Sequence, residues 1–200
     1  MHPASAFAQT DETQLRAFVA ERGFAVLAAQ GEAGPVTAHA AVILTGALLR
    51  FHLSAANRMV AALAARPRLT AVITGPDAYV SPDWYAAADQ VPTWNYVAAE
   101  IEGNARALDR AGAAALLDDL SAHFEARLAP KLPWTRGKMT PARFEALLGG
   151  IVAYEVPIER FEGTWKLSQN KPAEIVRVAE RLEDLPDAGS HAVARLMRDL

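Results

Sequence analysis

The sequence predicts a mainly β fold with flanking helices, built as a small antiparallel barrel with helices packed outside it. Short apolar runs separated by tight turns fill the first part of the chain, which favours hairpins over a doubly wound parallel sheet. Segments with helical apolar spacing and capping residues follow, with one late strand among them. The composition, with 52% hydrophobic and 22% charged residues, is that of a folded domain.

Local signals place the predicted elements along the chain. The stretch 30–34 reads as a hairpin turn, Asp109 caps a long helix, and Thr140 is an N-cap followed by proline at the first helical position. Proline ends the second helix, at Pro67. The predicted strands are 24–29, 35–43, 47–53, 69–74, 100–105 and 151–156, and the predicted helices are 10–22, 54–66, 109–128, 140–149, 172–182 and one after Ser190.

Composition and missing motifs exclude several classes of protein. The chain has no cysteine, so disulfides, thiolate nucleophiles and cysteine-held metals are excluded. Its net charge is −3, and it has neither a signal-peptide pattern nor a long apolar run, so we expect a cytoplasmic protein without a membrane segment. Dinucleotide-binding, phosphate-loop, serine-hydrolase and zinc-protease motifs are absent, and the histidines lack metal-ligand spacing. We therefore assign no catalytic residue and no metal.

One candidate site lies where a strand turns into a helix. His52 ends the strand, and Ser54 and Asn57 offer hydroxyl and amide donors. Arg58 falls in the first helical turn, where an anion also meets free backbone N–H groups. The same residues suit an ordinary serine cap with a solvated arginine, so the pattern leaves a phosphate site and a plain helix cap both open.

Three further groups of polar residues could contact a ligand. Thr37 and His39 are two apart on one strand and so share a face, although a buried histidine bonded to backbone fits as well. Asn95 stands between two aromatic residues, which either contact a heteroaromatic edge or belong to the core. Lys166 and Gln169 belong to the polar, non-helical segment 161–170, which suits an anion site or a loop over one end of the barrel.

The chain has one basic stretch. Five lysines and arginines occur between Glu125 and Glu145 without an intervening acid. Such a stretch is either a solvated loop or a nucleic-acid contact. If DNA is bound, we expect Arg136, Lys138 and Arg143 to contact it, with strong sensitivity to salt.

Three segments resemble a known family. They are GPDAYVSPDWY at 75–85, VPTWNY at 91–96 and GTWKLSQN at 163–170. Together and in this order they resemble the PaiB family, FMN-binding negative transcriptional regulators related to the pyridoxamine 5′-phosphate oxidase split barrels. The resemblance spans about residues 1–183, which we expect to form one FMN-binding split-barrel domain. Residues 184–200 are then a C-terminal helical extension.

The resemblance implies a split barrel that forms a homodimer with two FMN sites at the subunit interface. One departure is that the related oxidases carry several basic residues at the strand-to-helix junction, where this chain has Arg58 alone. The arginines that hold the substrate phosphate in those oxidases also lack a clear counterpart. The cofactor-binding residues implied are His52, Ser54, Asn57 and Arg58 at the phosphate, Thr37 and His39 beside the flavin, Asn95 facing its ring, and Trp165, Lys166 and Gln169 from the partner subunit.

The function expected from the resemblance is that of an FMN-binding homodimer of the PaiB type that acts as a negative transcriptional regulator. Two alternatives remain open from the sequence. One is an FMN-dependent oxidoreductase acting on a small molecule, since a flavin carries its own chemistry. The other is a haem-binding relative of the same barrel, with His39 or His52 as the axial ligand.

Overall fold

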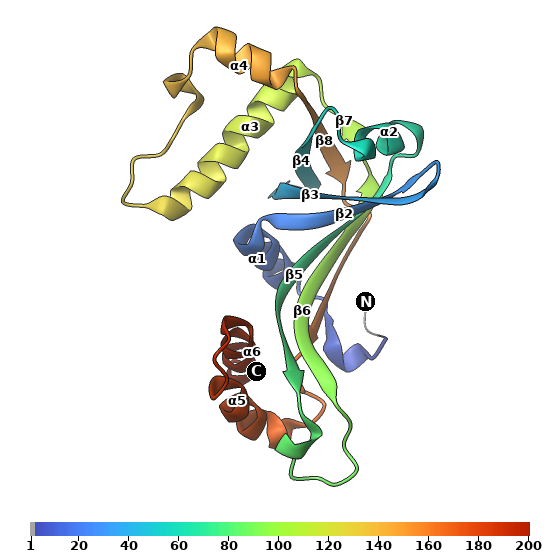
Figure 1. Ribbon diagram of the computed structural model, residues 1–200, viewed down its shortest axis with the longest axis vertical. Coiled ribbons are helices and arrows are strands. Elements are labelled where there is room, and N and C mark those ends of the chain that lie inside the picture. Colours follow the sequence, from blue (N-terminus) through green and yellow to red (C-terminus); the bar gives the residue numbers. More distant parts are fainter. Residues whose placement is uncertain (1–2) are drawn as a thin grey trace. The chain divides into compact units, whose positions relative to one another are not determined.

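The computed structural model describes residues 3–200, which form an antiparallel sheet with helices around it (Figure 1). The strands follow the hydrogen-bonded order β1-β9-β6-β5-β2-β3-β4-β8-β7. The predicted mainly β fold with flanking helices is thereby confirmed. The strands are β1 (Ala8–Gln9), β2 (Phe24–Gly31), β3 (Gly34–Thr45), β4 (Leu48–Ser54), β5 (Arg68–Val80), β6 (Thr93–Asn104), β7 (Arg106–Ala107), β8 (Ile151–Pro157) and β9 (Arg160–Lys166). The α-helices are α1 (Glu12–Arg22), α2 (Arg58–Ala65), α3 (Arg110–Glu125), α4 (Pro141–Leu148), α5 (Ile175–Glu183) and α6 (Ala188–Arg198).

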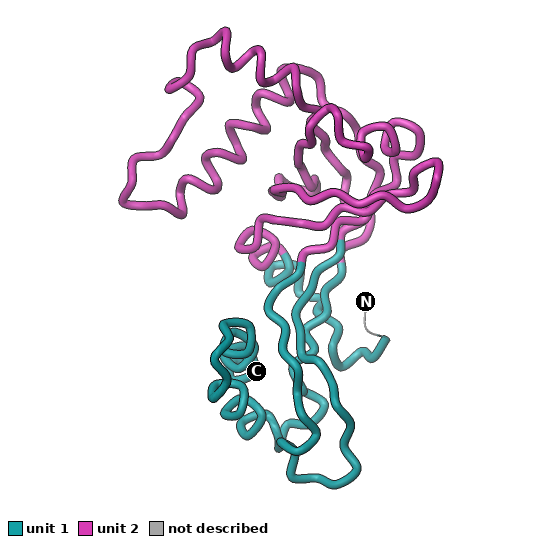
Figure 2. The backbone as a smooth tube through the Cα atoms, viewed as in Figure 1, with its two compact units in different colours: residues 1–15, 74–100, 162–200 teal, residues 16–73, 101–161 magenta. Residues whose placement is uncertain are grey.

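The chain divides into two compact units, neither of which is continuous in sequence (Figure 2). Unit 1 combines residues 1–15, 74–100 and 162–200, and unit 2 combines residues 16–73 and 101–161. The last seventeen residues, 184–200, belong to unit 1.

Strand alternation gives unit 2 a buried inner face. Side chains at Leu27, Val42 and Phe51 point inward and have no exposed surface. Helix α2 contacts β2 and β3, and its Met59 and Leu63 are also buried. Because successive strand residues point to opposite sides, this apolar inner set fixes which polar side chains point outward.

Helices α3 and α4 cover part of the outer side of the sheet at β3, β4 and β8. Their Leu116, Leu120 and Phe144 form one core cluster with Ile43 of β3 and Ala153 of β8. An ion pair between Arg50 of β4 and Asp119 of α3, with 2.7 Å between nitrogen and oxygen, lies at the same contact. A half-buried pair of this kind adds modestly to stability.

Helices α5 and α6 contribute to the apolar core of unit 1. They pack against each other, and Val178, Leu182, Val193 and Met197 have at most 1% of their surface exposed. Figure 1 shows this helix pair beside the unit 1 portions of β5 and β6. The C-terminal helix α6 therefore takes part in the core of unit 1.

Several boundaries differ from the predicted ones. Helix α2 begins at Arg58 and not at Ser54, because Ser54 still pairs with Ile151 in the sheet and Asn57 caps the helix. Strand β5 continues past Gly75 and Pro76, since the φ angle of proline suits extended backbone. The segment 161–170 contains most of strand β9.

A methyl group at Gly103 should disrupt the sheet. A Cβ there would collide with the carbonyl oxygen of Pro157 and lie 2.7 Å from Val156 Cγ1, and backbone cannot move aside cheaply. We expect Gly103→Ala to lower the free energy of unfolding by about 3 kcal/mol in urea denaturation. Gly137→Ala is the control, because its nearest neighbour would be 3.7 Å away. Equal stability of the two variants would contradict this packing.

Candidate functional site

Four of the residues predicted to contact the cofactor lie on the outer face of β3 and β4. The register pairs Val42 with Phe51, both buried inside, and therefore turns the alternate residues outward. Thr37, His39 and Ser54 are exposed on this face, and His52 is half-buried on it.

An aromatic stack lies at the exposed part of this face. Phe24 of β2 is 57% exposed, and its ring stacks on His39 with 6.2 Å between centroids and 19° between planes. Val26 pairs with His39 on one side and with Val72 of β5 on the other, so apolar side chains continue the surface. Such a surface can receive a flat apolar ring. Sequence reasoning missed Phe24, although alternation from the buried Ala25 and Leu27 would have placed it outward.

The turn from β4 into α2 presents several hydrogen-bond donors. Ser54 Oγ accepts from Ala56 N at 3.4 Å, and Asn57 Oδ1 accepts from Met59 N at 2.9 Å. These contacts use acceptor oxygens and leave the Ser54 hydroxyl hydrogen and the Asn57 amide hydrogens available. Arg58 is exposed at the first helical position, and no described residue forms an ion pair with it. The turn is therefore suited to an anion.

His52 carries a buried nitrogen without a partner. It pairs with Ala153, which belongs to the core under α3 and α4, and its Nδ1 has no hydrogen bond within residues 3–200. Burial lowers the pKa of His52 below its ordinary value, because the imidazolium is poorly solvated there. A neutral imidazole at this position still needs a hydrogen-bond partner.

Asn95 is wholly buried in unit 1. Its side-chain nitrogen lies 3.0 Å from Ser168 Oγ and 3.4 Å from Met197 Sδ of α6. Ser168 has a left-handed backbone with φ of 64°. This placement favours a role in joining β6 to the C-terminal helices over the predicted contact with the flavin ring.

Lys166 and Gln169 also contact their own chain. The Lys166 ammonium donates to Thr93 Oγ1 at 2.6 Å and to the carbonyl of Trp94 at 2.5 Å. Burial first, and the charge of Lys171 second, lower its pKa. Gln169 accepts from Leu167 N at 2.8 Å and donates to the carbonyl of Trp165, which closes the turn after β9.

The predicted cofactor residues thus fall into two sets. The first set belongs to unit 2 and occupies the outer face of β3 and β4 and the turn after β4. Its members are Thr37, His39, His52, Ser54, Asn57 and Arg58. Asn95, Trp165, Lys166 and Gln169 lie in unit 1.

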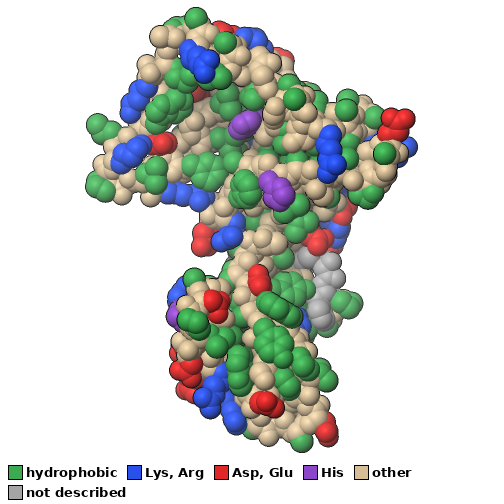
Figure 3. Space-filling model, in the orientation of Figure 1, with side chains coloured by type: hydrophobic (Ala, Val, Ile, Leu, Met, Phe, Trp, Pro, Cys, Tyr) green, Lys and Arg blue, Asp and Glu red, His purple; other side chains and the backbone are tan. Residues whose placement is uncertain are grey.

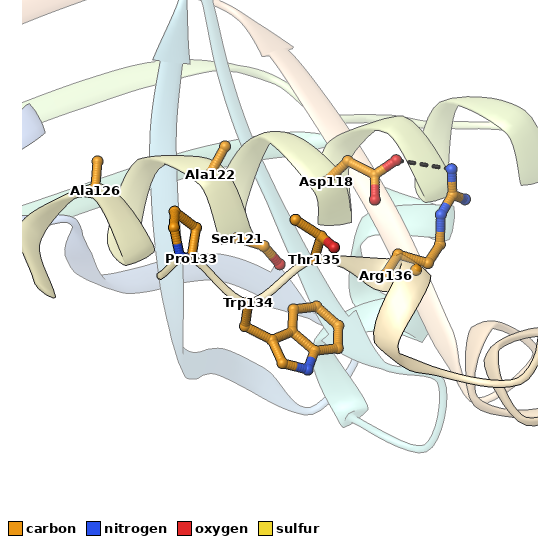
Figure 4. Close-up of a pocket in the computed structure, with 9 residues that line it drawn as sticks. Asp118, Ser121, Ala122, Ala126, Pro133, Trp134, Thr135 and Arg136 are labelled. Carbon is orange, nitrogen blue, oxygen red and sulfur yellow. Dashed lines mark ion pairs between the residues drawn. The ribbon is translucent and has the colours of Figure 1, made fainter. Parts of the chain in front are cut away.

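The basic stretch lies along the connection between α3 and α4, and much of its charge is already paired. Arg136 forms an ion pair with Asp118 at 2.8 Å (Figure 4). Its guanidinium also lies over the Phe144 ring. Lys138 donates to the carbonyl of Pro133. Figure 3 shows basic side chains separated by apolar and acidic ones over this part of the surface, while Arg143 is exposed on α4. The basic side chains of this connection are therefore typical of a solvent-exposed loop and do not form a continuous positively charged surface, which DNA binding favours.

Comparison with known proteins identifies the family. The sequence profile described as "Putative FMN-binding domain" matches residues 1–160. The chain therefore belongs to this family of FMN-binding domains. It is also 27% identical over 203 residues to the Bacillus subtilis (strain 168) protein named "Protease synthase and sporulation protein PAI 2", covering 96% of this chain and 94% of that protein. The predicted family and its cofactor, FMN, are confirmed.

Solved structures of low sequence identity share the fold of this FMN-binding domain. The FAD and heme binding protein from Mycobacterium smegmatis is 19% identical with a TM-score of 0.59, over 80% of this chain and 73% of that one. The flavocytochrome Anf3 from Azotobacter vinelandii is 15% identical with a TM-score of 0.61, over 83% of this chain and 72% of that one. Within residues 3–200 no cluster of side chains could hold a metal ion, and no helix is long and apolar enough to span a membrane.

The lowered pKa of His52 predicts a loss of stability in acid. As pH falls through the ordinary value of 6.5, the unfolded chain takes up this proton before the folded protein does, so the free energy of unfolding decreases. We expect wild type to lose more stability than His52→Gln between about pH 7.5 and about pH 5.5, measured by urea denaturation at each pH. His39→Gln, which changes an exposed imidazole, should behave like wild type. An identical pH dependence in all three proteins would argue against the buried neutral imidazole.

Proposed function

We propose that the FMN phosphate binds at the turn between β4 and α2. The observation that carries this proposal is Arg58, an exposed cation without an ion pair among the described residues, at the start of a helix of eight residues. Ser54 and Asn57 add neutral donors beside it. A guanidinium, an amide and a hydroxyl at a helix N-terminus match the charge and the acceptor oxygens of a phosphate.

The outer face of β3 and β4 supplies the rest of the proposed site in unit 2. FMN also has a flat ring system, which suits the exposed surface around His39 and Phe24. His52 precedes Ser54 by two residues on the same face, so its half-buried side chain lies next to the turn that holds the proposed phosphate site. When bound, FMN supplies the capacity to accept and release electrons.

We propose further that the protein works as a homodimer in which Trp165, Lys166 and Gln169 of one copy complete the site of the other. The partly buried Lys166 ammonium is a donor for a pyrimidine carbonyl, where negative charge collects on reduction of a flavin. Thr93 and the Trp94 carbonyl hold this ammonium in place. Because Gln169 binds backbone on both sides, its contribution is to keep the Lys166 segment in this conformation.

The biological role we propose is that of a regulator of the PaiB type whose state depends on its flavin. Support comes from the similarity to the Bacillus subtilis protein, which runs nearly end to end. Direct DNA contact through Arg136 and Lys138 would require these side chains to leave their contacts with Asp118 and Pro133. We therefore expect direct contact of these two side chains with DNA to be weak.

Removal of the Arg58 guanidinium should weaken FMN binding. We expect Arg58→Ala to cost about 1–3 kcal/mol, or about fivefold to 150-fold in the dissociation constant, because a charge-assisted hydrogen bond is lost. Quenching of flavin fluorescence during titration with protein measures the constant. Arg66→Ala is the matched control, since it removes an exposed arginine just after the other end of the same helix. Equal affinities of the two variants would reject the phosphate site.

A mixture of two defective variants should recover FMN binding if the sites are shared between copies. Arg58→Ala and Lys166→Ala would each lack one half of every site. A co-expressed mixed dimer would contain one site with both changes and one intact site, so about one site in four of the whole population should bind with wild-type affinity. Flavin titration of the mixture counts those sites, and sedimentation velocity checks the dimer. A mixture with no intact sites would show that the two side chains do not meet across a dimer.

A further inference from the structure

Unit 2 contains a hollow beside helix α2 that none of the preceding roles uses. Its volume is about 390 Å³, which is enough for a molecule of one or two rings. It lies apart from Ser54, Asn57 and Arg58, none of which lines it. The lining residues are Val60, Leu63 and Ala64 of α2, Pro67, Ala105, Ala107, and Val152 and Tyr154 of β8.

The hollow has a buried floor and an open rim. Leu63, Ala105 and Tyr154 are 3%, 8% and 4% exposed, so they form the floor. Ala64 and Ala107 are exposed, which places the entrance between α2 and β7. A small molecule can therefore enter without unfolding of the helix.

Tyr154 supplies the one polar side chain of the lining. Its ring stacks on Phe51 with 5.3 Å between centroids, which fixes its orientation. No described residue forms a hydrogen bond with its hydroxyl, and the hydroxyl oxygen is open to solvent, since among the described residues only His52 Nδ1 is a buried polar side-chain atom without a partner. Burial raises the pKa of Tyr154, so the hydroxyl remains protonated and able to donate near neutral pH.

The lining also defines the charge of a ligand. None of the lining side chains carries a charge. An ion in the hollow would lose its water without gaining a counter-charge, which is strongly unfavourable. An uncharged ligand with an apolar body gains from burial against Val60, Leu63 and Val152.

We propose that this hollow is a binding site for an uncharged, mainly apolar small molecule with one hydrogen-bonding oxygen, which pairs with the Tyr154 hydroxyl. A simple phenol has this chemistry. The site is separate from the proposed FMN site, and its occupation does not depend on FMN.

The test uses phenol and toluene as probes on the full-length protein, with saturation-transfer NMR to follow binding. Tyr154→Phe keeps the ring and removes the hydroxyl, so it should weaken phenol about threefold to tenfold and leave toluene unchanged. Ala64→Leu fills the entrance and should abolish binding of both probes. Ala61→Leu is the matched control, because Ala61 is equally exposed on α2 but does not line the hollow. Addition of FMN should displace neither probe.

Three results would overturn the proposal. One is the absence of saturation transfer to either probe in the wild type, which would mean that the hollow holds water alone. A second is equal binding by the Ala64→Leu and Ala61→Leu variants, which would place the probes elsewhere. The third is an equal loss of phenol and toluene in Tyr154→Phe, which would remove the hydroxyl from the contact. If Tyr154→Phe fails to fold, as judged by circular dichroism, the comparison of Ala64→Leu with Ala61→Leu still tests whether the probes bind in the hollow.

Discussion

Burial of one face of the β2–β3–β4 strands is the constraint on which the rest of unit 2 depends. Leu27, Val42 and Phe51 have to leave water together, and a strand can turn only alternate residues inward. Shifting a strand by one residue would expose these side chains and bury Thr37 and His39 in their place. The polar outer face is thus a consequence of the apolar inner one. The same register delivers the end of β4 to the turn where Asn57 and Arg58 begin a helix.

Much of the fold could be predicted from local signals, because they have local causes. The Asp109 cap, the Thr140–Pro141 start and the hairpin turn after β2 depend on side chains within a few residues, and all three are present. The end of β5 and the existence of β9 could not be predicted in this way. Each depends on partners that are distant in sequence, so neither Gly75–Pro76 nor the polar run 161–170 indicated a strand.

At the candidate site, the sequence indicated which kinds of side chain are present better than it indicated which residues contact them. The pattern at 54–58 indicated a serine cap beside an exposed arginine; the arginine is exposed, but the cap is not Ser54. It gave no sign that Asn57, and not Ser54, is the cap, since that depends on the pairing of β4 with β8. The burial of Asn95 follows from contacts with Ser168 and Met197, which are 73 and 102 residues away. No local pattern reveals such distant partners.

The long separation between Asn95 and Met197 has a consequence for synthesis of the protein. All of unit 2 has been translated once residue 161 has been added, whereas unit 1 still lacks both of its C-terminal helices at that stage. Met197 is synthesised after Ser168, the other residue bonded to the Asn95 side chain. The amide of Asn95 therefore lacks this cover until synthesis has reached α6, and a chain that stopped before Met197 would leave the amide without it.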